Sequence, residues 1–463
     1  MKKILIVISL ALLLVFPSCR PDIQHPGAPD TITTWAELFE AWWADMSKNY
    51  VFWSLDAPEG HEWDDVLEEN LPIMESYGEI GVSESTDKEA LRVFFDLVKN
   101  LHDGHHRLSI TNGNSLTGAF SPLLYRSMLK AGMTDDEAFE AMLTASPPQY
   151  SQLYATSDFV VENTLSIMQN TFGISGAESA SSLNVPFEQG SVDGFKKSGY
   201  LKVPKGTVVN NNDVGNFAMF LGITDDDILY LVFSGFDISY FISSYYGGEN
   251  NQYAEAVFNL MTTYDSILSS YAEGSSDLNG IIIDLRGNGG GNPLDFYFLY
   301  SNLIPENLKI AKVRIKQSDN RYSYTHWNDF SITGYAENDA VMSNLPITVL
   351  TNMRSVSCSE ISCMAFMAMR EEYGADIVLV GGTTAGGNGP LAPMDYLNAG
   401  SSSIMPYISL IYTPGMQLVY RDGTSYEGKG IDPDIEVDFN YSQFISGTDS
   451  RLRVALDYIR SKK

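Results

Sequence analysis

A cluster of hydroxyl and thiol side chains occupies the stretch "TNMRSVSCSE", residues 351–360. An apolar strand pattern here turns into a helix pattern, and a serine or cysteine at such a turn can serve as a nucleophile. The same residues also suit a simpler role, because Ser357 and Glu360 have the spacing of a helix capping box. On spacing alone the pattern favours the cap, so a nucleophile needs a second observation.

That observation is the stretch "IIIDLRGNGGGNP", residues 281–293, in which an apolar strand pattern leads into a glycine-rich turn. Bare backbone N–H groups at such a turn can approach a negatively charged atom. A phosphate loop is excluded because no Gly-Lys-Ser/Thr ending follows, and a dinucleotide loop because Asn292 stands where a glycine is required. A tight turn would explain only some of the glycines, so an oxyanion hole is the better interpretation.

Both stretches lie in a region that alternates strands with helices from about residue 226. Apolar runs predict strands at 227–236, 280–285, 346–352 and 376–382, and helical patterns lie at 254–271, 293–303 and 359–373. Continuous apolar runs, rather than strict alternation, indicate an α/β domain with parallel strands. Hydroxyls at one strand-to-helix turn and N–H groups at another form a common mounting for a nucleophile, which shifts the balance away from a simple cap.

The N-terminus predicts export. Lys2 and Lys3 precede an apolar run at 4–16 that is short for a membrane span but suits a signal peptide. A small residue then precedes Cys19, which resembles a bacterial lipoprotein cleavage site at which that cysteine is lipidated. Phe16 and Pro17 fit this pattern imperfectly, and an ordinary signal or an uncleaved anchor is the alternative. We expect a membrane-anchored lipoprotein of the bacterial cell envelope, on its periplasmic or surface side.

The length of 463 residues predicts two or three domains. After the signal peptide, 1–18, and a tether, 19–31, capping boxes at Thr34 and Thr86 begin amphipathic helices. The expected units are a helical N-terminal domain at 32–106, an intermediate region of unassigned fold at 107–225, the α/β domain at 226–440 and a C-terminal helix at 441–463.

Composition excludes several classes of protein. The formal net charge is −29, and no cluster of lysine and arginine offers a basic patch, so nucleic acid is not an expected partner. Besides Cys19, the chain has only Cys358 and Cys363, which lie on one predicted helix, so a disulfide framework is absent. No cofactor or metal ion is expected.

At this order and separation, "GIIIDLRGNGGG" and "SVSCSEI" resemble the serine peptidases of the C-terminal processing (tail-specific) and tricorn-core family. The similarity spans roughly 226–437, includes "ILYLVFSGF" and "YEGKGIDPDIEV", and has weaker support from "LHDGH". The resemblance implies a crotonase-like (ClpP/crotonase) peptidase domain. It also implies that the first serine of Ser-x-Ser-Glu, here Ser357, is the nucleophile.

The sequence differs from the tail-specific branch at the general base that activates the serine. That branch uses a lysine in the loop after the next strand. Here that loop reads "VGGTTAGGNGP", and no lysine occurs between Ser357 and Lys429. The resemblance to the tricorn-core branch instead implies His105 as general base and Glu427 as its carboxylate partner. It further implies oxyanion donors at Gly290, Gly289 and the N–H of Cys358.

Each assignment has an alternative. His102 and His105 could bind a metal, although no His-Glu-x-x-His signature accompanies them. Glu427 could be only a turn residue, the thiol of Cys358 could be the nucleophile, and Lys429 could act as the base from another direction.

The expected function is a lipid-anchored serine endopeptidase acting on exported proteins or peptides. A catalytically degenerate binding protein on the same scaffold is the alternative, because a fold can be kept after its catalytic site has been lost. No carboxylate-binding Gly-Leu-Gly-Phe loop of a PDZ domain is found in 107–225. Cleavage specificity, any PDZ-like domain and the oligomeric state stay open.

Overall fold

The computed structural model describes residues 31–143, 162–174, 184–204, 206–214, 217–249, 251–334, 341, 344–391 and 400–463. The predicted signal peptide, Cys19 and nearly all of the tether lie outside these ranges. Within them, no helix is both long and apolar enough to span a membrane.

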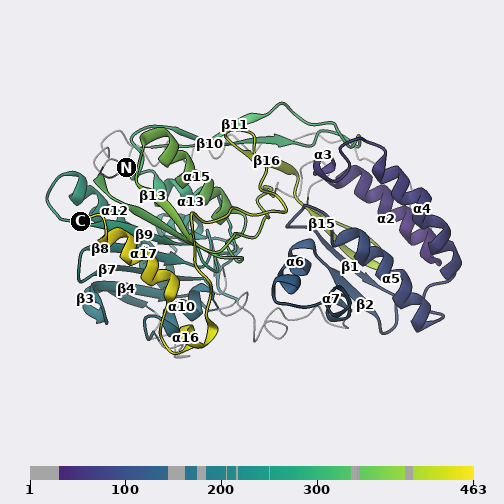
Figure 1. The fold of residues 1–463 in the computed structure, drawn as a ribbon, viewed down its shortest axis with the longest axis horizontal. Coiled ribbons are helices and arrows are strands. Elements are labelled where there is room, and N and C mark those ends of the chain that lie inside the picture. The colour runs from purple at the N-terminus through teal and green to yellow at the C-terminus, as the bar shows by residue number, and fades with distance from the viewer. Residues whose placement is uncertain are drawn as a thin grey trace.

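The N-terminal lobe is built on amphipathic helices (Figure 1). Aromatic side chains on their apolar faces pack edge to face, as Phe94 does against Phe39 and Trp42. The capping box at Thr34 is confirmed, but the helix that contains Thr86 is capped one turn earlier by Ser83. The helices are α2 (Trp35–Asn49), α3 (Trp53–Asp56), α4 (Glu62–Tyr77), α5 (Glu84–Val98), α6 (Pro122–Lys130) and α7 (Asp135–Met142).

This lobe also contains an antiparallel sheet, ordered β14-β15-β1-β2. The chain enters it directly after α5 and returns to it almost three hundred residues later, so that Leu108 pairs with Ile411. The apolar cluster of the helices therefore crosses the predicted boundary at 106 and includes residues from the predicted α/β segment. The strands are β1 (Arg107–Thr111), β2 (Thr117–Phe120), β14 (Gly400–Ile404) and β15 (Ile408–Thr413).

The second lobe holds an eight-stranded sheet, ordered β17-β13-β12-β9-β8-β7-β4-β3. Its first five strands are parallel, so the predicted α/β fold with parallel strands and a helical N-terminal region is confirmed. Three antiparallel strands extend the sheet into the region whose fold the sequence left unassigned. The strands are β3 (Asn184–Val192), β4 (Phe195–Lys202), β7 (Ala218–Thr224), β8 (Ile228–Phe233), β9 (Gly280–Asp284), β12 (Ile347–Thr351), β13 (Ile377–Gly381) and β17 (Ile435–Glu436), and a separate pair is formed by β5 (Val208–Val209) and β6 (Asn212–Asp213).

Helices cover both faces of this sheet (Figure 1). Along β9, Ile281 and Ile283 join the apolar cluster of one face, whereas Ile282 joins that of the other. Burial on both faces explains why these strands are continuous apolar runs in the sequence. One face packs against α11 (Ile238–Tyr246), α12 (Gln252–Ala272), α13 (Asp295–Tyr300) and α15 (Cys358–Tyr373), and the other against α10 (Thr164–Asn170) and α17 (Ser450–Arg460), with α16 (Tyr441–Ile445) before α17.

A small sheet joins the two lobes. It consists of β10 (Leu308–Ile315), β11 (Asn328–Ile332) and β16 (Met416–Tyr420). The segment between β10 and β11 reaches the helices of the N-terminal lobe, where the Tyr324 hydroxyl donates to Val51 O at 2.7 Å and Arg321 pairs with Asp64 at 2.6 Å. These contacts fasten one lobe to the other.

Candidate active site

Ser357 sits at the turn between β12 and α15 in a strained backbone conformation. Its φ of 58° and ψ of −118° are rarely adopted by a residue other than glycine, and such strain is concentrated at functional sites. The predicted capping box is wrong, because the Ser357 side chain makes no cap hydrogen bond. An N-cap needs an extended backbone, and this turn does not have one.

The neighbouring hydroxyl and thiol groups are engaged elsewhere. The Ser355 hydroxyl donates to Leu285 O, and the Ser359 hydroxyl donates to Asn288 O, each at 2.9 Å. The Cys358 thiol lies 3.1 Å from Gly291 O, and burial raises its pKa to about 12. Ser357 is half-buried, so its hydroxyl is the one of the four that suits attack on a substrate.

The glycine-rich turn after β9 lies against Ser357. A Cβ built on Gly290 would stand 2.6 Å from the Ser357 Cβ, whereas one on Gly289 would meet no atom within 4 Å. The N–H of Gly290 donates to Asn288 Oδ1 at 2.9 Å and must leave it to bind an oxyanion. The N–H of Cys358 belongs to the first residue of α15, where backbone N–H groups lack intrahelical partners and favour an anion.

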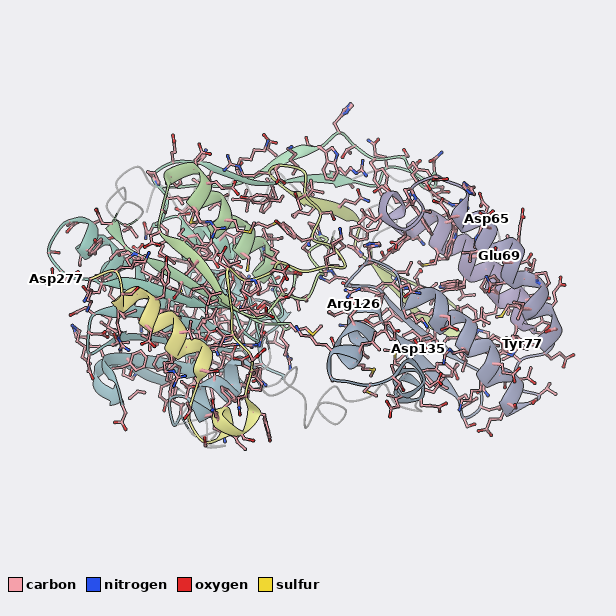
Figure 2. The ribbon with its side chains drawn as sticks, in the orientation of Figure 1. Asp65, Glu69, Tyr77, Arg126, Asp135 and Asp277 are labelled. Carbon is pink, nitrogen blue, oxygen red and sulfur yellow. The ribbon has the colours of Figure 1, made fainter. Side chains whose placement is uncertain are left out.

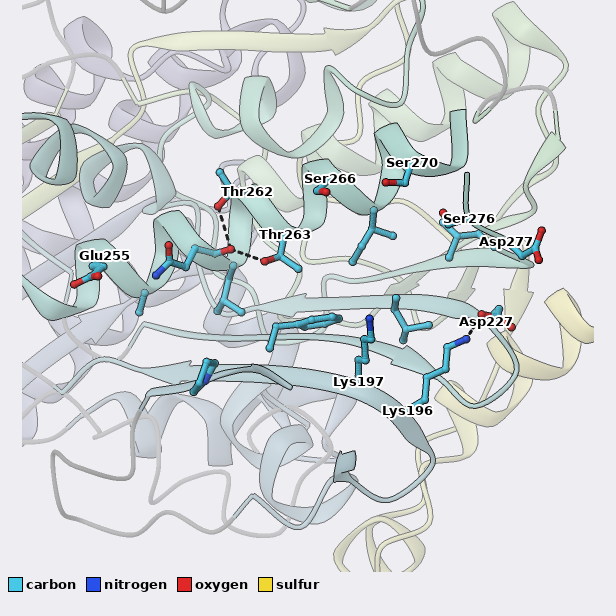
Figure 3. A pocket seen from close by; sticks show the side chains of 18 residues that line it. Lys196, Lys197, Asp227, Glu255, Thr262, Thr263, Ser266, Ser270, Ser276 and Asp277 are labelled. Carbon is cyan, nitrogen blue, oxygen red and sulfur yellow. Dashed lines mark hydrogen bonds and ion pairs between the residues drawn. The ribbon is translucent and has the colours of Figure 1, made fainter. Parts of the chain in front are cut away.

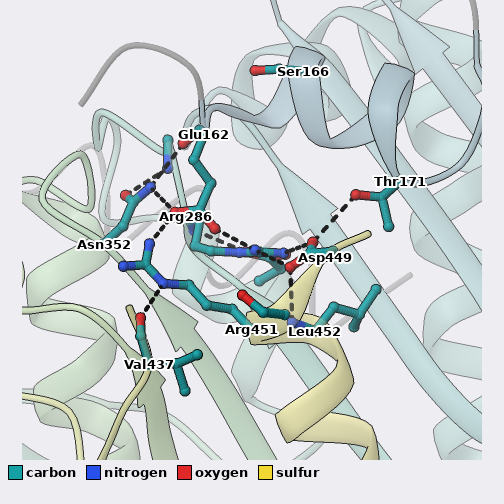
Figure 4. Close-up of polar contacts among 12 residues, drawn as sticks. Glu162, Ser166, Thr171, Arg286, Asn352, Val437, Asp449, Arg451 and Leu452 are labelled. Atoms are coloured by element: carbon teal, nitrogen blue, oxygen red, sulfur yellow. Dashed lines mark hydrogen bonds and ion pairs between the residues drawn. The ribbon is translucent and has the colours of Figure 1, made fainter. Parts of the chain in front are cut away.

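A buried charged network, drawn in Figure 4, is joined to this turn. Arg286 is fully buried and donates to Asp284, Glu162 and Asp449 at 2.5 to 2.9 Å. Asn352 links the network to the turn, because its Oδ1 accepts from the N–H of Gly287 at 3.1 Å. Sequence reasoning missed this support, although a charged pair beside a buried strand, Asp284 and Arg286, signalled it.

The loop after β13, residues 384–389, is held by two buried carboxylates. Glu360 accepts from the Thr384 hydroxyl and from two backbone N–H groups, those of residues 386 and 387, at 2.7 to 2.8 Å. Glu427 accepts from the N–H groups of residues 388 and 389 at 2.9 and 2.8 Å. The same loop returns a contact to the nucleophile turn, since the Ser357 N–H donates to Gly387 O at 2.9 Å.

His105 stands on the loop between α5 and β1, which packs on residues 386–387. A Cβ on Gly104 would lie 2.5 Å from Gly386 O and from the Gly387 Cα. Close approach, rather than the left-handed cap conformation suggested by its place after a helix, therefore requires glycine there. The N–H of Gly104 donates to Glu427 at 2.9 Å, so the carboxylate bonds to both loops.

The structure brings His105 and Glu427 together and adds a residue that sequence reasoning missed, Asp103. A ring nitrogen of His105 and carboxylate oxygens of Asp103 and Glu427 all lie within 4.8 Å of one another. Asp103 is fully buried, and it accepts from the backbone N–H of His105 and from the Thr413 hydroxyl at 2.8 and 2.7 Å. Its place in "HDGHH" was the available signal.

Burial controls the charges of these groups. It lowers the pKa of His105 to about 4, with Arg107 acting in the same direction, and it raises the pKa of Asp103 to about 7. Burial, and then the charge of Asp103, raises the pKa of Glu427 well above its usual range. A neutral imidazole at neutral pH is the form that a general base requires.

The alternative residues lie elsewhere. His102 pairs with Asp56 at 2.7 Å. Among the described residues, the cluster of possible metal ligands that contains His105 consists of Asp103, His105 and Glu427, and His102 is not part of it. His106 is fully buried beside Tyr50, and Lys429 is exposed to solvent, whereas a lysine base must be desolvated.

A separate groove of about 1270 Å³ lies between α12 and the strands β3 and β4 (Figure 3). Hydroxyl groups of α12, such as those of Thr262 and Thr263, donate to the helix's own carbonyl at Asn259. The lysine at its edge, Lys196, is paired with Asp227. None of the residues that line the groove comes from the loops that carry Ser357, His105 or Glu427.

Comparison with known proteins finds a matching family model and solved structures of similar fold. Residues 242–437 match the model of Peptidase family S41. The fold is similar to that of a putative peptidase from Parabacteroides merdae, with 17% identity over 93% of this chain and 98% of the other and a TM-score of 0.53. It is also similar to a mutant of CPAF, with 12% identity, coverage of 92% and 98% and a TM-score of 0.50. No curated protein matches the chain.

Proposed function

We propose that this serine peptidase, whose residues 242–437 belong to Peptidase family S41, cleaves peptide bonds with Ser357 as nucleophile, His105 as general base and Glu427 as its carboxylate partner. One observation carries the proposal. The carboxylate of Glu427 accepts from the histidine-bearing loop at Gly104 and from the loop whose carbonyl at Gly387 receives the Ser357 N–H. Three segments far apart in the chain thereby meet at one point.

The proposed reaction is acyl transfer to water. As the Ser357 oxygen bonds to the substrate carbonyl carbon, its proton passes to His105, and the carbonyl oxygen becomes an oxyanion. The N–H of Cys358 and an N–H of the turn at 289–290 stabilise that charge. His105 then gives the proton to the leaving amine, and a water molecule releases the acyl group by the reverse sequence.

Glu427 and Asp103 serve the imidazolium stage of this reaction. A histidine that has taken up a proton carries a positive charge in a buried site, and a nearby carboxylate lowers the cost of that charge. The backbone N–H groups that hold Glu427 also fix its position relative to His105. The alternative, a binding protein with a degenerate site, would have no need for this arrangement.

The substrate class is protein or peptide, and the proposed location is the bacterial cell envelope, with the enzyme anchored to a membrane on the periplasmic or surface side. The supporting feature is the sequence of residues 1–19, in which an apolar run at 4–16 is followed three residues later by Cys19. Lipidation of Cys19 would hold the enzyme at the membrane, so that it acts on exported chains.

Labelling with a fluorophosphonate probe tests the proposal, because the probe reacts with an activated serine. The full chain should be labelled at Ser357 and should cleave an unfolded protein substrate such as casein. His105→Ala should lose both properties while remaining folded. A folded, unmodified chain that neither reacts with the probe nor cleaves any protein substrate would instead support the binding protein.

A further inference from the structure

Three buried carboxylates surround the contact between the loops of the site. Asp103, Glu360 and Glu427 are each fully buried, and together they hold the loops at 101–106 and 384–389. Like charges in a buried site repel one another, so such a cluster calls for a cation. Among the described residues, Arg126 interacts electrostatically with all three.

Arg126 comes from the N-terminal lobe. It lies on α6, on the side of that lobe facing the large sheet (Figure 2), and is half-buried. Its guanidinium donates to Leu101 O at 3.4 Å and to Gly386 O at 3.3 Å. The first carbonyl begins the histidine-bearing loop, and the second belongs to the loop that carries the Ser357 contact, so one side chain bridges both.

We propose that Arg126 is a positioning residue of the peptidase site, which joins the histidine-bearing loop to the loop at 384–389 and balances the buried carboxylates beside His105. The inference rests on the proposed roles of Ser357, His105 and Glu427. Arg126 touches neither substrate nor reacting atoms, and it acts through the groups that do.

The charges around Arg126 support this role. Burial lowers the pKa of its guanidinium, and the charges of Glu427, Glu360 and Asp103 raise it in return. An electrostatic interaction is mutual, so the guanidinium favours the ionised forms of those carboxyls. The other titratable groups that face the cluster are His105, Tyr50, Asp56 and Arg107.

Removal of the charge should therefore affect the pH dependence as well as the rate. In Arg126→Gln the carboxyls keep their protons up to a higher pH. The acid limb of the kcat/KM profile should therefore move by about one unit to higher pH. Loosening of the loops should lower kcat roughly tenfold to a hundredfold, with a smaller change in KM. Labelling by the fluorophosphonate probe should slow in parallel.

Arg126→Lys separates charge from geometry, since it keeps the charge but loses the planar fork that spans two carbonyls. It should keep the normal acid limb and still show a reduced kcat. Lys130→Gln is the matched control, because it removes one charge from the exposed end of the same helix. It should leave both the rate and the pH profile unchanged.

The inference is overturned if folded Arg126→Gln shows the kcat and acid limb of the unmodified chain. It is equally overturned if Lys130→Gln shifts the limb as much, since the effect would then be one of overall charge. Should Arg126→Gln not fold, a normal kcat in Arg126→Lys would overturn the bridging role. Retention of activity in Ser357→Ala would be a different result, which removes the proposed function itself.

Discussion

Glu360 and Glu427 divide the backbone of one loop between them, each accepting from two of the four consecutive N–H groups at 386–389. Buried backbone donors need acceptors, and here the acceptors are carboxylates from a helix and from a distant turn. The loop therefore acts as a scaffold that connects Ser357 to the histidine-bearing segment. Such a loop has no need to supply the base, which agrees with its lack of a lysine.

Replacing Ser357 by Ala should abolish peptidase activity and leave the fold intact. Loss of a triad serine lowers turnover by roughly a millionfold. Because the hydroxyl caps no helix, the free energy of unfolding should change by less than about 1 kcal/mol. Turnover is measured on a peptide substrate, and unfolding by urea titration. Residual activity that a thiol reagent abolishes would move the nucleophile to Cys358.

Replacing His105 by Ala should remove most activity, whereas Lys429→Ala should cost little because that side chain is exposed. Glu427→Gln should lie between them, since it keeps a hydrogen-bonding shape but withdraws the charge that stabilises the imidazolium. Rates are compared per folded molecule.

His106 provides the internal control for this series, being adjacent in sequence but fully buried. His106→Ala should lower stability while the folded fraction keeps its turnover. Near-normal turnover in His105→Ala, with loss in either His106→Ala or Lys429→Ala, would show that the base is assigned to the wrong residue.

Replacing Gly290 by Ala should inactivate the enzyme through a collision. The added methyl would lie 2.6 Å from the Ser357 Cβ, and the φ of 91° also disfavours any side chain. We expect at least a hundredfold loss of kcat/KM, because displacement of a nucleophile by about 1 Å has that effect.

Gly289→Ala is the matched substitution one residue earlier, where the methyl would meet no atom within 4 Å. It should retain far more activity than Gly290→Ala. Equal losses in both variants would mean that the turn tolerates no side chain for reasons unrelated to Ser357.

Replacing Asp103 by Asn should move the acid limb of activity to lower pH. The charge of Asp103 raises the pKa of Glu427, so without it Glu427 ionises at lower pH. The imidazole of His105 also loses a neighbouring negative charge, and its pKa falls further. Initial rates measured across pH 4 to 9 give the limb directly, and a shift to higher pH would contradict this account.

The same substitution should alter stability with a definite sign. The pKa of Asp103 is about 7 in the fold, against about 3.9 in an unfolded chain, so the folded state binds this proton more tightly between those values. Stability from this group is greatest at low pH and is lost as pH rises through 7. Asp103→Asn lacks this titration and therefore this loss. The melting temperature of the variant, minus that of the chain with Asp103, should increase from pH 5 to pH 8.

Replacing Cys19 by Ala should abolish lipidation and release the protein from the membrane fraction. The protein that keeps Cys19 should partition into detergent, and mass spectrometry of its mature N-terminus should find an acylated cysteine. A mature chain that begins at another residue without a lipid would exclude the lipoprotein proposal.

Much of the α/β lobe follows from local patterns. Strands such as β9 and β12 are buried on both faces, so their apolar runs are visible in the sequence and their parallel pairing is confirmed. The capping box at Ser357 failed because local spacing carries no information about φ. Tertiary contacts set that angle, including the bond from the Ser357 N–H to Gly387 O.

The motif "HDGHH" marked the neighbourhood of Asp103 but not its contact with Glu427, and no pattern in the sequence pointed to the role proposed for Arg126. Both residues lie near Glu427 in the fold but far from it in the sequence. Gly104, next to Asp103, bonds to Glu427 across 323 residues, and no local period encodes such a contact. The antiparallel partnership of β1 with β15 was hidden for the same reason. The roles of Ser357, His105 and Glu427 stay predictions, which the substitutions above can test.

The return of the chain to the first lobe at β15 has a consequence for biosynthesis. The sheet that positions the histidine-bearing loop lacks two of its four strands until residues 400–413 have emerged, and Glu427 follows later still. Contacts of such long sequence separation form slowly. On the proposed roles of Ser357 and His105, a chain still on the ribosome holds the nucleophile before its base is positioned. We therefore expect proteolysis to begin only after residues 400–427 have emerged.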